Sequence, residues 1–113
     1  MRRISTHILD MIDGKPAGGV PVRLEKQSDR DWKLLNSELT DQDGRCAQLL
    51  RENEEMSAEV YRLIFDTGSY YAQKQISSLY PVAEVTFQAR GGESHFHIAL
   101  LLSPNGYTTY RGS

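Results

Sequence analysis

Residues 95–102, HFHIALLL, restrict the possible folds of this chain most, because they predict a β-strand with two different faces. Side chains alternate across a strand. One face is therefore wholly apolar and suits a protein core, with Phe96, Ile98, Leu100 and Leu102. The other face combines two histidines with apolar residues, namely His95, His97, Ala99 and Leu101. Since a half-apolar face is seldom left open to water in a monomer, we expect another subunit to cover it.

The rest of the chain consists of short segments of similar character that end at turn signals. β-Favouring residues occupy positions 3–9, 20–25, 32–39, 45–50, 60–65 and 83–88. Residues 69–78 predict a short helix capped by Ser69, and the acidic residues 52–59 predict a solvated connection. Seven or eight short strands with one short helix are typical of an all-β protein, an antiparallel β-sandwich.

Length and composition limit the classes of protein and partner. A length of 113 residues predicts one domain, residues 1–113. The net charge of −2 argues against a nucleic-acid partner, and no apolar run is long enough to cross a membrane. The chain shows no hydrophobic signal region, and its single cysteine, Cys46, can form no intrachain disulfide. We therefore predict a cytoplasmic protein, in which Cys46 is a packed residue rather than a nucleophile.

Three further features each have two interpretations. His7 lies on the strand face opposite Ile4 and Ile8, either as a partly exposed histidine or as part of a site. Arg45 follows the tight-turn signal at residues 41–44. It is either solvated or a fixed cationic fork that grips a planar, oxygen-rich ligand. The tail at residues 110–113 is either a frayed chain end or part of a site.

The ending LLLSPNGYTTYRGS, residues 100–113, resembles the C-terminal signature of the 5-hydroxyisourate hydrolases, the transthyretin-like proteins of urate breakdown. Other segments resemble motifs of the same family, at residues 5–10, 14–17, 41–45, 65–68 and 95–97. The resemblance implies a transthyretin-like β-sandwich that forms a homotetramer, a dimer of dimers with active sites at the dimer–dimer interface. It also implies catalysis without a metal or cofactor. The chain departs from the family pattern at Ala99, at Asn105 and near residues 81–84.

The resemblance also implies a reaction and a set of site residues. The reaction is the hydrolysis of 5-hydroxyisourate to 2-oxo-4-hydroxy-4-carboxy-5-ureidoimidazoline. The catalytic positions map to His7, Arg45, His97 and Ser113. Substrate contacts map to His7, Arg45, Tyr110, Arg111, Gly112 and Ser113. None of the positions at which the chain departs from the family pattern belongs to these sets.

The types of these residues suit the opening of a cyclic amide by water. A histidine, with an ordinary pKa of about 6.5, accepts a proton near neutrality, and two histidines can share proton removal and delivery. Arg45 stays charged, can hold ring oxygens bidentately and can stabilise negative charge in the transition state. The sequence does not decide which histidine is the base. Our hypothesis is His97, with His7 as its partner.

Three alternative interpretations of these residues can be compared with the hydrolase. The first is a transthyretin-type carrier of a small aromatic ligand, which would not need His7, Arg45, His97 or the tail. The second is a structural sandwich module, which leaves the clustered histidines unexplained. The third is a zinc site on His95, His97 and His7, for which no well-placed carboxylate completes the ligand set.

Overall fold

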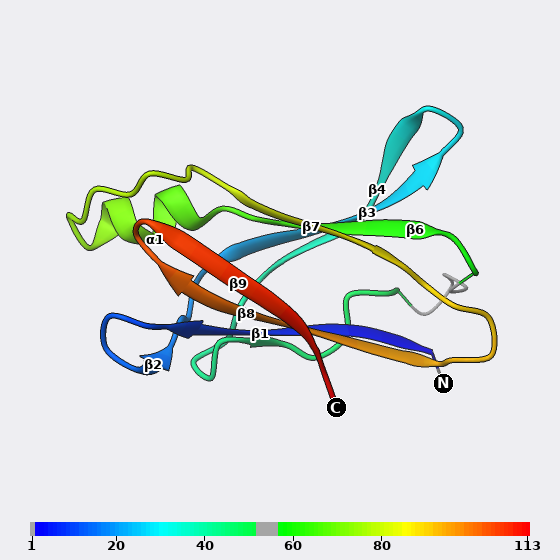
Figure 1. Ribbon diagram of the computed structural model, residues 1–113, viewed down its shortest axis with the longest axis horizontal. Coiled ribbons are helices and arrows are strands. Elements are labelled where there is room, and N and C mark those ends of the chain that lie inside the picture. Colours follow the sequence, from blue (N-terminus) through cyan, green and yellow to red (C-terminus); the bar gives the residue numbers. More distant parts are fainter. Residues whose placement is uncertain (1, 52–56) are drawn as a thin grey trace.

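The computed structural model describes residues 2–51 and 57–113, which form two β-sheets packed face to face (Figure 1). A short helix lies at one end of the two layers. Of the connection predicted at residues 52–59, positions 52–56 lie outside the described residues. The described part contains nine strands, and two of these, β2 (Lys15–Pro16) and β5 (Arg45–Cys46), are only two residues long. The seven longer strands agree with the predicted number.

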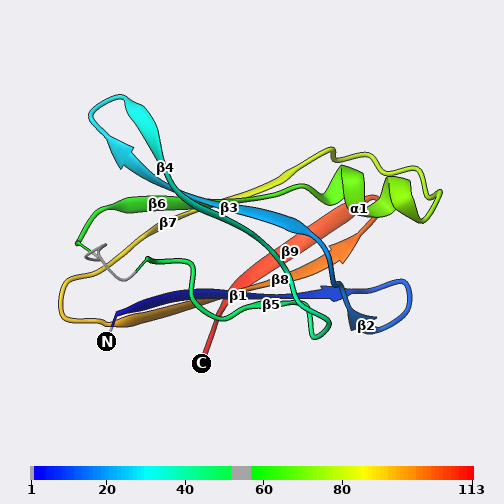
Figure 2. The same ribbon diagram turned by 180° about the vertical axis from the view of Figure 1, so that it is seen from behind.

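The first sheet carries the histidines. Its order is β2-β1-β8-β9, and β5 pairs with β1 beside β2. The longer strands of this sheet are β1 (Arg3–Asp10), β8 (His95–Ser103) and β9 (Gly106–Gly112). Figure 2 shows β5 running alongside β1. The pairing of β1 with β8 is parallel, whereas the other pairings in the sheet are antiparallel.

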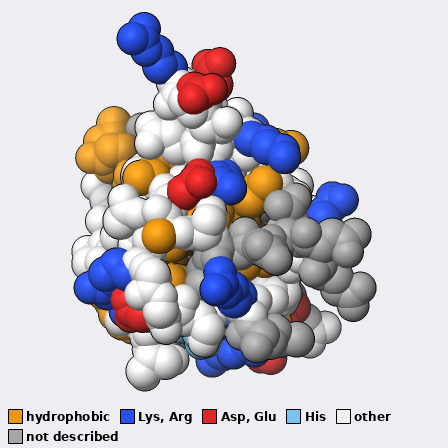
Figure 3. Space-filling model, turned by 90° about the vertical axis from the view of Figure 1, so that its right-hand side faces the viewer, with side chains coloured by type: hydrophobic (Ala, Val, Ile, Leu, Met, Phe, Trp, Pro, Cys, Tyr) orange, Lys and Arg blue, Asp and Glu red, His pale blue; other side chains and the backbone are white. Residues whose placement is uncertain are grey.

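The second sheet covers the first and is antiparallel throughout, in the order β4-β3-β6-β7. Its strands are β3 (Pro21–Ser28), β4 (Asp31–Leu39), β6 (Val60–Phe65) and β7 (Ala83–Gln88). At the end of the sandwich opposite the helix, charged side chains of both signs are dispersed among hydrophobic ones (Figure 3).

The core lies between the inner faces of the sheets. From β8 it receives the four residues of the predicted apolar face, all of which are buried. From β1 it receives Ile4, Thr6 and Ile8, and from the second sheet mainly Val22, Leu24, Tyr61, Leu63 and Phe65. The alternation therefore predicted correctly which face of β8 is inside. The opposite face of the first sheet carries the polar residues considered below.

Two local predictions were wrong. The helix α1 (Thr67–Gln73) begins before Ser69, and its cap is Asp66, whose carboxylate accepts from the Ser69 backbone N–H at 3.1 Å. The strand expected at residues 45–50 ends at Cys46, because Leu49 and Leu50 turn into the core. Over the described part of the chain, no helix has the length and apolarity needed to span a bilayer.

Candidate active site

The pairing of the strands sets two rows of residues on the open face of the first sheet. Arg45 of β5 is the cross-strand partner of His7, which is in turn the partner of Ala99 in β8. Ala99 is the partner of Tyr110, which is 54% exposed. Because directly paired residues share a face, these four side chains form one row. The strands thus place His7 beside Arg45 and on the same face as Tyr110.

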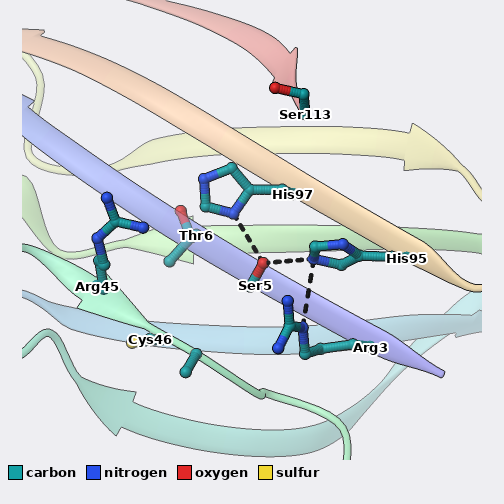
Figure 4. Close-up of a pocket in the computed structure, with 9 residues that line it drawn as sticks. Arg3, Ser5, Thr6, Arg45, Cys46, His95, His97 and Ser113 are labelled. Carbon is teal, nitrogen blue, oxygen red and sulfur yellow. Dashed lines mark hydrogen bonds between the residues drawn. The ribbon is translucent and has the colours of Figure 1, made fainter. Parts of the chain in front are cut away.

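A second row lies two residues along each strand, on the same face, and contains Ser5, His97 and Gly112. A cavity of about 230 Å³ opens beside it. In Figure 4, the His97 ring lies among Ser5, Arg45 and Ser113. The lining comes from β1, β5, β8 and the residues after β5 and β9: Arg3, Ser5, Thr6, Arg45, Cys46, Ala47, His95, His97 and Ser113. The fold therefore brings three of the four predicted catalytic residues into one cavity, and His7 lies beside one of them as the cross-strand partner of Arg45.

Ser5 joins the two histidines of β8. Its Oγ lies 2.7 Å from Nδ1 of His97 and 3.0 Å from Nε2 of His95. The Arg3 Nε–H donates to the same His95 Nε2 at 3.4 Å. Ser5 is only 4% exposed. The sequence prediction did not include Ser5 in the site, although the alternation of β1 had placed it on the same face as His7.

The surroundings of His97 favour its neutral form. Burial lowers the pKa of the ring, and the nearby Arg45 guanidinium lowers it further, with smaller contributions from His95, His7 and Arg3. Burial and the charges of Arg3 and Arg111 also lower the pKa of His95. A neutral imidazole can accept a proton. His97 is therefore held in the protonation state that a general base needs.

Gly112 allows the tail to lie against the His97 ring. A Cβ atom at position 112 would lie 2.5 Å from Cδ2 of His97 and 3.5 Å from its Nε2. A carbon–carbon approach of 2.5 Å is far inside ordinary contact. The absence of a side chain at Gly112 thus leaves room for the His97 ring. The tail is not a frayed end, because β9 stays paired with β8 as far as Gly112.

Arg111 does not line the cavity. Its guanidinium pairs with Glu93 at 2.7 Å, donates to the His95 carbonyl oxygen at 2.9 Å and lies over the Phe96 ring, 4.5 Å from the centroid. The structure places it on the side of β9 opposite Tyr110, as the alternation indicated. Within this chain the side chain ties the end of the tail to β8, and the substrate contact expected for Arg111 stays a prediction.

Two other chemical possibilities can be compared with the geometry. Cys46 is 2% exposed, and burial, with smaller contributions from Glu38 and Asp41, raises the pKa of its thiol to about 12. Because the thiolate is the nucleophilic form, this environment suits a packed residue. Across residues 2–51 and 57–113, no three His, Cys, Asp or Glu side chains are grouped closely enough to hold a metal ion. His95 and His97 instead both contact Ser5.

The chain is similar to known proteins over nearly all of its length. Residues 4–112 match the HIUase/Transthyretin family. A 5-hydroxyisourate hydrolase of Salmonella typhimurium is 46% identical over 110 residues, which are 97% of this chain and 80% of that protein. A 5-hydroxyisourate hydrolase of Mus musculus is 40% identical over 112 residues, which are 97% of this chain and 94% of that protein.

Solved structures of two kinds share the fold. A 5-hydroxyisourate hydrolase of Klebsiella pneumoniae superposes with a TM-score of 0.87 at 36% identity, with both chains covered completely. A sea bream transthyretin in complex with thyroxine superposes with a TM-score of 0.90 at 36% identity, over 97% of this chain and 94% of that one. The two sheets and the cluster on their open face thus define a transthyretin-like β-sandwich protein. The chain belongs to the HIUase/Transthyretin family.

Proposed function

We propose that this protein hydrolyses 5-hydroxyisourate to 2-oxo-4-hydroxy-4-carboxy-5-ureidoimidazoline, a step of urate degradation. The observation that carries the proposal is the convergence of His97, Arg45 and Ser113 on one cavity. The fold does not separate a hydrolase from a carrier, because both kinds of protein have it. The site supports the hydrolase, because a carrier that only binds its ligand does not require a neutral histidine held beside an arginine.

The positions of these groups support the following chemistry. Water attacks the ring carbonyl carbon while Nε2 of His97 accepts a proton from it. The Arg45 guanidinium stabilises the negative charge that develops on the carbonyl oxygen. When the carbon–nitrogen bond of the ring breaks, the imidazolium returns the proton to the departing nitrogen. His7, in the row next to His97, contacts the substrate and shares proton delivery, and the Tyr110 and Ser113 hydroxyls orient the ring.

We also propose a homotetramer, a dimer of dimers, in which a second copy closes each site. The cavity of about 230 Å³ in one chain is smaller than a typical ligand pocket of about 300–1,000 Å³. Ala99, Leu101 and the half-exposed Tyr110 share the open face with the histidines. Because a covered face excludes water from the reaction, assembly would complete the site. Light scattering on the purified protein measures the number of subunits, and a monomer would contradict this part of the proposal.

The activity is tested by following freshly prepared 5-hydroxyisourate with and without the protein, since the substrate also decays spontaneously. We expect clear acceleration, reduced about 10²- to 10⁴-fold by His97→Ala and unaffected by a chelator. The control is Thr67→Val, which removes a buried hydroxyl from the first residue of α1, where it donates to the Tyr80 carbonyl oxygen. Absence of acceleration by the folded protein would favour the carrier function, which a search for bound aromatic ligands then examines. The cytoplasmic location stays a prediction that cell fractionation can check.

A further inference from the structure

We infer that Ser5 is a positioning residue that fixes the proton of neutral His97 on Nδ1 and leaves Nε2 free as the base. The hydrogen-bond geometry carries the assignment of the proton. Only its consequence for catalysis rests on the proposed function. The inference also gives His95 and Arg3 a role, since both set the direction of the hydrogen bonds that reach Ser5.

The argument begins at Arg3, at the outer end of the chain of contacts. A guanidinium has N–H donors and no acceptor. The contact between Arg3 Nε and His95 Nε2 at 3.4 Å is therefore a hydrogen bond only when that imidazole nitrogen carries no proton. Neutral His95 must then carry its proton on Nδ1. The nitrogen of His95 that faces Ser5 is thus an acceptor.

Ser5 is the next link, and it has one hydroxyl proton. The contact between Ser5 Oγ and His95 Nε2 at 3.0 Å requires that proton, because the nitrogen has none to give. Ser5 Oγ therefore has no proton left for His97. Its 2.7 Å contact with His97 Nδ1 is a hydrogen bond only when Nδ1–H is the donor. One arrangement of protons is thus compatible with all three contacts, and in it the Arg3 and Ser5 donors share the lone pair of His95 Nε2.

The other nitrogen of His97 is then an acceptor on the side where a substrate would bind. The ring edge that includes Cδ2 and Nε2 lies against Gly112, and Arg45 and Ser113 line the cavity beside it (Figure 4). The Ser5 hydroxyl is almost completely buried and lies between the two imidazole rings. Removing the hydroxyl would leave His97 Nδ1 without its acceptor and allow the proton to occupy Nε2.

The proton position can be measured without substrate. Nitrogen-15 NMR of the folded protein, above the pKa of His97, distinguishes a protonated ring nitrogen from an unprotonated one. We expect Nδ1–H in the wild type and a substantial Nε2–H population in Ser5→Ala. In His95→Phe the Ser5 proton loses its acceptor and can turn to His97 Nδ1, so Nε2–H should increase there too. An Nε2–H tautomer in the wild type would overturn the inference. So would an Nδ1–H tautomer in Ser5→Ala that is unchanged from the wild type.

Kinetics then test the consequence. We expect Ser5→Ala to lower kcat about 10²-fold with a smaller change in KM, because a wrong tautomer removes the base rather than the binding site. Ser5→Thr keeps the hydroxyl and should recover most of the rate and the wild-type tautomer. Thr67→Val controls for loss of a buried hydroxyl. If the wild type did not accelerate hydrolysis, the proposed function would fail while the NMR result still decided the role of Ser5. Wild-type kcat in a folded Ser5→Ala protein would overturn the catalytic part.

Discussion

Gly112 lies opposite His97 in the β8–β9 pair, so closely that a methyl group at position 112 would lie 2.5 Å from Cδ2 of the ring. The ring cannot move aside freely, because Ser5 holds Nδ1 at 2.7 Å. A side chain at position 112 must therefore displace either the tail or the histidine. This relationship connects the end of the chain to the proposed base.

The first prediction concerns this contact. Gly112→Ala should lower kcat/KM about 10²-fold, since a displacement of about 1 Å at a reacting group has an effect of that size. The matched control is Gly106→Ala in the same strand, where the nearest atom to an added Cβ is Ser103 Oγ at 4.0 Å. Steady-state kinetics and circular dichroism of both variants provide the measurements. Equal activity of the two variants would show that the contact with His97 is unimportant.

The second prediction concerns pH. Burial and the Arg45 charge lower the pKa of His97 below its ordinary value, so the base stays neutral and kcat/KM stays high somewhat below pH 6.5. Arg45→Gln removes the neighbouring positive charge, while His7, Arg3 and His95 remain around the ring. The pKa should therefore rise, which an NMR titration of the His97 ring measures directly. Arg30→Gln, on an exposed turn of the other sheet, is the control. An unchanged or lower pKa in Arg45→Gln would contradict the prediction.

The third prediction concerns the attachment of the tail. Arg111 and Arg90 both pair with Glu93, at 2.7 and 2.8 Å, but only Arg111 belongs to β9. Arg111→Met should therefore loosen the end of β9 and lower kcat/KM about 10-fold through the misplaced Ser113. Arg90→Met should leave the end of β9 and kcat/KM unchanged. Amide hydrogen exchange of the last residues reports the loosening, and unchanged protection in Arg111→Met would mean that strand pairing holds the tail by itself.

The fourth prediction concerns stability. The Asp10 carboxylate is 1% exposed and accepts hydrogen bonds from the Tyr70 and Tyr71 hydroxyls at 2.8 and 3.1 Å. Asp10→Ala would leave two buried donors unpaired and should reduce the free energy of unfolding by about 2–4 kcal/mol. Lys74 pairs with both Asp10 and the more exposed Asp13. Asp13→Ala breaks only the second of these ion pairs and should change the free energy of unfolding by less than about 1 kcal/mol. Denaturant unfolding at a fixed protein concentration gives the free energy of unfolding of both variants. Similar losses in the two variants would show that the buried hydrogen bonds of Asp10 contribute no more than the exposed ion pair.

Local patterns predicted the parts of this protein that depend on neighbouring residues. The alternation at residues 95–102 identified the buried face of β8, because side chains in a strand point to opposite sides whatever the strand pairs with. The same rule placed Arg111 opposite Tyr110. The predicted start of the helix was wrong, because the Asp66 carboxylate caps the helix ahead of Ser69. Resemblance to a family, rather than pattern, supplied Arg45 and Ser113 as site residues.

The sequence by itself thus determined the two-faced strands, the all-β class and the candidates His7, Arg45, His97 and Ser113. Only the tertiary structure decided which of them share a cavity and that Ser5 belongs with them. Ser5 meets His97 across 92 positions of the chain, through the parallel pairing of β1 with β8. That register is set by the packing of Ile4, Ile8 and the β8 core face between the sheets. A shift of one residue would turn Ser5 inward, so the proton arrangement at His97 depends on the packing of the whole core.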